Sequence, residues 1–224
     1  MNLENRFFIK VQPWNADAVV SNLSGGVGHQ LVNIYGFKPD YFISGNQNKK
    51  YNNVYAYFGA GGKFRKYFAW NAMGKIDMVG YYKGNWSLDA AMKFSSWIVK
   101  EGVHLTAKFH ASSRRPNYFY NNLYSNHYIW NYDFANTQTT KIEGLLQIPH
   151  WGLEASVGYS LLNKNIYLDS LYTPIQNGTA MSVLSGYISK NLAIGPLHLE
   201  NRVLFQLSSK QEIIPLPKLA LNLR

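Results

Sequence analysis

The histidines are the first residues in this chain whose type could do metal or acid–base chemistry. No pair of them has the three- or four-residue spacing of a helical metal site. His104 and His110 lie on one face of a predicted strand, but they are separated by about 20 Å of extended chain. With no cysteine in the sequence, a Cys-based metal site and a disulfide framework are both excluded. The sequence therefore predicts no metal site, and we expect these histidines to be polar side chains of the fold. The six are His29, His104, His110, His127, His150 and His198.

Nucleophile and phosphate motifs are equally sparse. Ser125-Asn126-His127 places a serine near a histidine, but no acidic partner is positioned beside them. No Gly-x-Ser-x-Gly elbow occurs. The glycine-rich run from Ser24 to Gly28 lacks the strand-then-helix context of a phosphate loop, so it predicts a turn. We expect no catalytic residue, no cofactor and no enzymatic activity.

Strands must position the polar residues, because apolar and polar side chains alternate through most of the chain. In residues 103–112 the odd positions are Val, Leu, Ala, Phe and Ala, and the even positions are His, Thr, Lys, His and Ser. A ten-residue strand, tilted near 40°, spans roughly 25 Å. The same alternation occurs over 87–95, 141–148, 153–161 and 198–208. Further strands are expected over 2–12, 53–59, 63–72, 75–83 and 179–190, and 16–45 leaves room for two more.

Composition agrees with strands that have one apolar and one polar face. Charged residues make up 15 %, against about 25 % in ordinary soluble domains. No run of roughly 18 apolar residues is present, so no membrane helix is expected. The net charge is +10, but the basic residues are scattered, and nucleic acid is not an expected partner. Aromatic residues reach 16 %, enough for two interfacial girdles.

The connections between the predicted strands differ in length, and this difference supports a more specific fold prediction. The short turns 149–152 and 193–196 alternate with long stretches at 113–136, 163–178 and 209–216. Outer-membrane barrels have short periplasmic turns and longer extracellular loops. We therefore predict an all-β, antiparallel transmembrane β-barrel of about a dozen strands, located in the bacterial outer membrane. A tyrosine-rich soluble β-sheet binding protein is the alternative from another class.

Two segments carry narrower expectations. If 63–72 is a strand, Lys66 shares the apolar side with Phe64 and Phe68, so it should lie near an interface and extend its ammonium outward. The stretch 118–131 is dense in aromatic residues and amides. It predicts a long loop anchored by Tyr and Trp, with sugar binding as the other interpretation.

The termini suggest a partial domain. The first six residues lack the features of a signal peptide, which a barrel needs for export. Residues 218–224 look like the start of a new strand. We expect one barrel domain over 1–224 that is incomplete at both ends.

Four short stretches follow one another along the chain: Tyr124–Asn131, Lys141–Gly144, His198–Asn201 and Ile214–Pro217. In order and spacing they resemble the putative porin family of Bacteroidota outer membranes. The resemblance is best over 75–224, whereas residues 1–60 show no such match. It implies a barrel considerably longer than 224 residues and no established substrate.

The leading hypothesis is a porin-like channel for passive diffusion of small polar solutes. Its partners would be outer-membrane lipid and small polar solutes or ions, and the sequence sets no oligomeric state. A barrel with a plugged lumen, acting as a surface binding or structural scaffold, is the alternative. Lipid-facing positions should include Leu105, Phe109, Leu146, Val157 and Phe205. Pore-lining positions should be Asp89, Lys93, His104, Lys108, His110, Lys141, Glu143, Glu154, Glu200 and Arg202.

Overall fold

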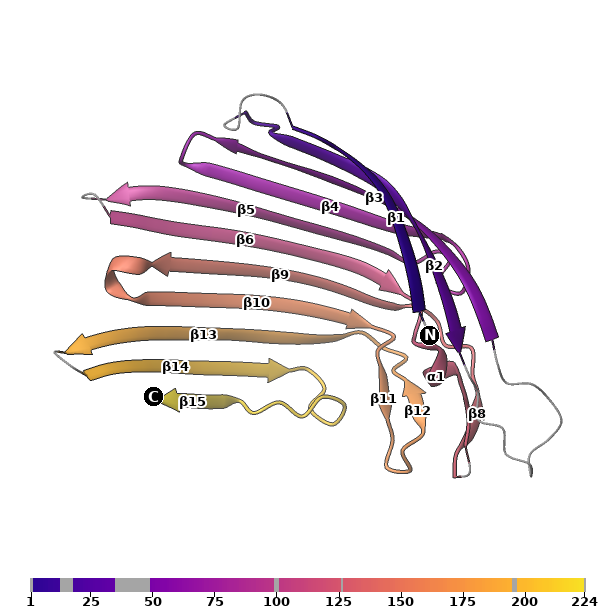
Figure 1. Ribbon diagram of the computed structural model, residues 1–224. Coiled ribbons are helices and arrows are strands. Elements are labelled where there is room, and N and C mark those ends of the chain that lie inside the picture. The colour runs from indigo at the N-terminus through magenta and orange to yellow at the C-terminus, as the bar shows by residue number, and fades with distance from the viewer. Residues whose placement is uncertain are drawn as a thin grey trace.

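The computed structural model describes residues 2–12, 18–34, 49–98, 101–125, 127–194 and 197–223. They form one antiparallel sheet of eleven strands, and two short hairpins that lie at the strand ends (Figure 1). Strands of the sheet follow one another in chain order, so each pairs with its sequence neighbours. The strands are β1 (Asn2–Val11), β2 (Asn22–Ile34), β3 (Lys49–Phe64), β4 (Phe68–Val79), β5 (Trp86–Ile98), β6 (Glu101–Arg114), β9 (Thr137–Ile148), β10 (Leu153–Asn163), β13 (Met181–Ile194), β14 (Leu197–Ser208) and β15 (Leu219–Leu223).

The register gives the sheet two chemically different faces. His110 of β6 lies between Asp89 of β5 and Lys141 of β9, and one residue away Phe109 lies between Ala90 and Ile142. Because side chains alternate along every strand and the register is unbroken from β4 to β14, each face keeps its character across the sheet. We call these faces the polar face, which carries His110, and the apolar face, which carries Phe109.

The sheet is open and strongly curved (Figure 1). Within the described residues, β1 and β15 each pair along one side only, so the predicted barrel is not closed. Side chains from strands that are not neighbours meet on the polar face: Glu4 of β1 accepts from the Tyr55 hydroxyl of β3, and Arg202 of β14 approaches Glu154 of β10. Such contacts place the polar face on the inner side of the curve.

Turns differ in length between the two ends of the strands. One end has the tight connections 65–67 and 149–152 together with the longer 12–21, and the other has the turn 80–85 together with the long connections 115–136, 164–180 and 209–218. The turn at Pro149–Gly152 is confirmed: a 3₁₀ turn, η1 (Pro149–Trp151), is closed by Gly152 in the left-handed conformation at φ 56°. The other expected turn, 193–196, includes Gly195-Pro196, which lies outside the described residues.

The three predicted strands 53–59, 63–72 and 75–83 are wrong in their boundaries. The chain instead forms two long strands, β3 and β4, joined by a turn at 65–67 with Arg65 at φ 51°. Lys66 is therefore a turn residue rather than a strand residue. Its ammonium lies 4.7 Å from the ring centre of Trp97. No glycine or proline marks this turn, which is why its position could not be read from the sequence.

The glycine-rich run from Ser24 to Gly28 is also not a turn, because it lies inside β2. Gly26 is opposite Tyr57 and Gly28 is opposite Tyr55. A side chain at Gly28 would overlap the Tyr55 ring, and one at Gly26 would overlap the Tyr57 ring and the Phe7 carbonyl. These glycines leave the space in which two tyrosine rings lie across β2.

The long connections at one end fold into structures of their own. Residues 115–136 contain a short helix, α1 (Tyr118–Asn121), and the hairpin β7 (Asn122–Tyr124) and β8 (Ile129–Asn131). Residues 164–180 contain the hairpin β11 (Ile166–Leu168) and β12 (Pro174–Gln176). Both hairpins run across the strand ends instead of along them (Figure 1). Among the described residues, no helix has the length and apolar character that crossing a membrane requires.

Buried residues concentrate where these connections meet the sheet. The Tyr81 hydroxyl donates to the Pro116 carbonyl at 3.1 Å and accepts from the Asn121 side chain at 3.0 Å. The Tyr81 amide donates to Asn53 at 2.8 Å. Burial, followed by the neighbouring tyrosines, raises the pKa of the Tyr118 hydroxyl. This loop core fixes 115–136 against the ends of β3 and β4.

Substitution at Gly26 tests the glycine–tyrosine packing. We expect Gly26→Ala to lower the free energy of unfolding by about 1–3 kcal/mol, because overpacking against a backbone carbonyl cannot relax cheaply. Gly25→Ala is the matched control, since its nearest neighbours lie 3.8 Å or more away. Urea unfolding followed by tryptophan fluorescence measures both. Equal stability of the two variants would contradict this packing.

Candidate functional site

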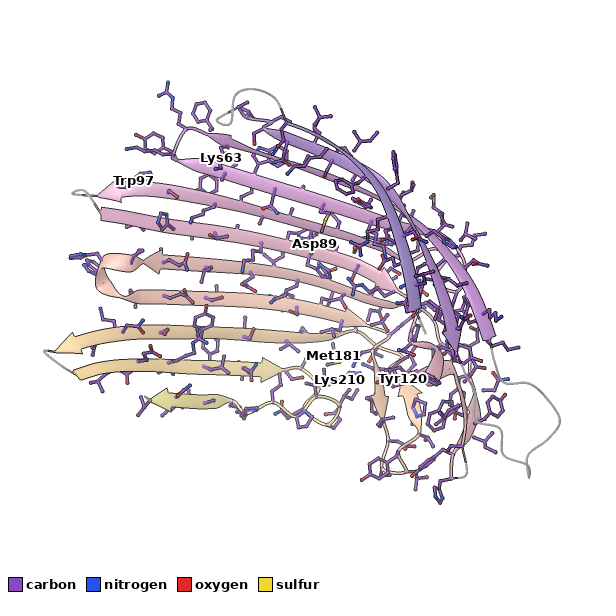
Figure 2. The ribbon with its side chains drawn as sticks, viewed as in Figure 1. Lys63, Asp89, Trp97, Tyr120, Met181 and Lys210 are labelled. Carbon is purple, nitrogen blue, oxygen red and sulfur yellow. The ribbon has the colours of Figure 1, made fainter. Side chains whose placement is uncertain are left out.

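All ten residues that the sequence placed in a pore lining share the polar face of the sheet. The register connects them in rows: Asp89, His110 and Lys141 form one row, and Lys108 and Glu143 form the next. Lys93 is opposite Thr106, and Glu200 is opposite Asn191. Figure 2 shows Asp89 in the middle of the sheet, far from the labelled strand-end residue Trp97. The structure thus brings the predicted residues onto one surface.

Charges on the central strands are paired. The Glu143 carboxylate receives Lys141 Nζ at 2.7 Å and Lys108 Nζ at 3.0 Å. The carboxylate is about one-fifth exposed, whereas both lysines are nearly half exposed. One acidic group therefore pairs with two ammonium groups on the polar face. Together with Asn71, Asp89 and His110, these three side chains line a hollow of about 350 Å³.

Asp89, His110 and Ser112 form a chain of hydrogen bonds across β5 and β6. Asp89 Oδ1 is 2.6 Å from His110 Nδ1, and His110 Nε2 is 3.1 Å from Ser112 Oγ. In the neutral tautomer with its proton on Nδ1, the ring donates to the carboxylate and Nε2 accepts from the serine hydroxyl. The second histidine of this strand, His104, has only Ser95 Oγ on its Nδ1, at 2.8 Å. Of these two histidines, His110 has a carboxylate partner and His104 has a serine partner.

Glu154 is the centre of a second group of polar side chains, on the strands nearer the C-terminus. Its carboxylate accepts from Gln147 at 2.9 Å and from the Tyr187 hydroxyl, and Arg202 lies 3.8 Å away. The Arg202 guanidinium also covers the Tyr187 ring at 4.4 Å. Glu154, Gln147, Arg202 and Glu200 border a second, larger hollow of about 600 Å³. The predicted residues thus fall into a central group and a group around Glu154.

The sequence prediction missed a third polar group on the first strands. Glu4 holds Arg6 at 2.9 Å and accepts from Tyr55, while Lys75 lies 4.1 Å from the Tyr55 ring centre and 3.2 Å from Asp77. The alternation of charged positions in 2–12 and 71–77 was a usable signal. The alternation could not show that Glu4 contacts Tyr55, because the glycine-rich strand β2 lies between their two strands.

The apolar face has no covering layer in the described part of the chain. Leu105 is 51 % exposed and Val157 is 54 % exposed, although both lie mid-strand. Phe109, Phe205 and Leu146 share this face with them. Soluble monomers rarely expose contiguous apolar patches larger than a few hundred Å². The sheet therefore has one polar face and one apolar face that no described residue covers.

Comparison with known families agrees with this geometry. A family model described as "Putative porin" matches residues 1–224, including the first 60 residues. The chain belongs to this family. No curated protein matches it. For a porin chain, the wet face with its paired charges is the surface that solute would contact, so the polar face is the candidate site.

The pairing of Lys108 and Lys141 with Glu143 predicts that part of the free energy of unfolding of this porin chain depends on salt. Glu143→Gln leaves Lys108 and Lys141 side by side without a counter-charge. We expect it to lower the free energy of unfolding by about 1 kcal/mol in dilute buffer, because partly exposed ion pairs contribute about that much. The loss should shrink in 1 M KCl, where the Debye length is about 3 Å.

Glu200→Gln is the control, since an amide, Asn191, lies opposite that carboxylate in the register. Urea unfolding of both variants at low and high salt measures the difference. A Glu143→Gln loss that equals the Glu200→Gln loss, or that is independent of salt, would contradict the pairing.

Proposed function

We propose that this sheet is part of the wall of an outer-membrane β-barrel, and that its polar face borders a path for passive diffusion of small polar solutes. The observation that carries the proposal is the uncovered apolar face, which lipid would cover. In lipid, unpaired backbone groups cost several kcal/mol each. The free edges of β1 and β15 would therefore pair with further strands when the barrel closes.

Aromatic side chains support a membrane orientation. Tyr67, Trp70, Trp97 and Trp151 gather at the short-turn end of the strands, and Lys66 lies over Trp97 there. Tyr and Trp favour the membrane–water interface, where an amphipathic ring has an apolar and a wet side. The short-turn end would be periplasmic, and the folded loops 115–136 and 164–180 would be extracellular.

A channel needs no catalytic residue, and family membership supports a transport role in general. The folded loops favour a second candidate, a barrel whose mouth serves as a surface scaffold. α1 and the hairpins β7–β8 and β11–β12 are held together by side chains: Gln176 donates to the Ala135 carbonyl at 2.7 Å and accepts from its amide at 3.1 Å. A rigid loop layer can present a binding surface even where no solute passes.

Single-channel recording separates the two candidates. We expect the full-length protein to give stepwise conductance in planar bilayers. Beyond the predicted residues, the polar face carries more basic than acidic side chains: Arg6, Lys10, Lys75 and Arg114 against Glu4 and Asp77. Wall charge of one sign attracts the opposite ion.

The reversal potential in asymmetric KCl should therefore show a mild anion preference. This preference should weaken as the salt concentration rises, because the Debye length becomes shorter. Absence of conductance would favour the scaffold. Cation preference, or a preference independent of salt, would contradict the assignment of these charges to the solute path.

A further inference from the structure

Asp89, His110 and Ser112 have the order and spacing of an acyl-transfer relay. A serine becomes nucleophilic when a histidine accepts its proton, and a carboxylate on the other ring nitrogen fixes the required tautomer. Here the two links are 2.6 Å, from Asp89 Oδ1 to His110 Nδ1, and 3.1 Å, from His110 Nε2 to Ser112 Oγ. We propose that Ser112 is the nucleophile of an esterase site on the polar face, with His110 as its general base.

Strand geometry holds this relay without a loop. His110 and Ser112 are two residues apart on β6, so they point to the same face, and Asp89 is directly opposite His110 on β5. Ser87 and Thr139 are opposite Ser112 on the two neighbouring strands. Positions fixed by a hydrogen-bonded ladder hold reacting groups more precisely than positions on a loop.

Positive charge lies next to the serine. Arg114 follows Ser112 by two residues on the same face. Ser87, which lies opposite Ser112, lines a hollow of about 310 Å³ together with Arg114, Lys75 and Asp77, and Asp77 lies 3.2 Å from Lys75 Nζ. A guanidinium there can stabilise the oxyanion that forms when an ester carbonyl is attacked. Ser112 is only 5 % exposed, so the site would take small esters of short acids and exclude the bulky chains of phospholipids.

The reaction is balanced with water as the only co-reactant. Ser112 Oγ bonds to the ester carbonyl carbon while its proton passes to His110 Nε2. His110 returns that proton to the leaving alcohol as the carbon–oxygen bond breaks, giving an acyl-serine. Water then gives a proton to His110 Nε2 and its hydroxide to the acyl carbon. As the bond from the acyl carbon to Ser112 Oγ breaks, His110 returns that proton to Oγ, which releases the acid and restores the serine hydroxyl and the neutral imidazole.

Covalent labelling tests the nucleophile on the unmodified protein. Diisopropyl fluorophosphate, a small serine-directed reagent, should phosphorylate Ser112 of the folded full-length protein, with loss of fluoride. Peptide mass spectrometry locates the adduct. Ser113, buried on the opposite face of the same strand, and Ser95, bonded to a histidine that has no carboxylate partner, are internal controls that should stay unlabelled. An absence of adduct on Ser112, or equal labelling of Ser95, would overturn the proposal.

Hydrolysis of p-nitrophenyl acetate tests the relay. Ser112→Ala should reduce the rate to that of buffer, and His110→Asn should lower kcat/KM by at least about a hundredfold. Asp89 is a positioning residue, so Asp89→Asn should lower kcat with little change in KM, and Asp89→Glu should restore part of the loss. Ser113→Ala should hydrolyse at the wild-type rate. Unchanged hydrolysis in Ser112→Ala would overturn the site, and it would leave the channel proposal standing because conductance is measured separately.

Discussion

The alternation of side chains along unbroken strands is the constraint on which the rest of the structure depends. An antiparallel sheet with a continuous register has two faces, and every residue is assigned to one of them by its parity. In this chain the polar face carries the ion pairs, and the apolar face carries Leu105, Phe109 and Val157 without a covering layer. An uncovered apolar face of this extent calls for an apolar surrounding, and the family of the chain is one in which that surrounding would be lipid.

Much of the charge on the polar face lies in local groups. Glu143 holds two lysines, and Glu154 holds a glutamine and a tyrosine and lies near an arginine. Such pairing holds the ends of long side chains close to one another on this face. These groups are partly exposed, so dissolved salt competes with the pairing. If the polar face borders a solute path, as we propose, passing ions would compete with it as well. Stability of the wall and selectivity of the path would therefore be linked through the same side chains.

The sequence predicted the parts of the fold that local periodicity determines, and it missed the parts that depend on partners. The alternation in 103–112 assigned β6 and its faces correctly. Gly26 and Gly28 have no side chain, so the alternation that marks a strand is absent there. Their place in β2 depends on Tyr55 and Tyr57 of β3, whose rings fill the space beside them. The turn after Phe64 lacks glycine and proline. Asp89 and His110 are far apart in sequence, so their contact follows from a register that no local pattern fixes.

A cysteine scan of β6 tests the two-faced wall most directly, because the chain has no native cysteine to interfere. Single cysteines at positions 103–112 would carry a nitroxide spin label in the full-length protein, reconstituted in lipid vesicles. Accessibility to oxygen, which partitions into lipid, and to a water-soluble nickel chelate would be measured at each position. The structure predicts that odd positions favour oxygen and that even positions favour the nickel chelate, with a period of two across the segment. Accessibility without this alternation, or water exposure at Leu105 and Phe109, would contradict a wall that separates lipid from water.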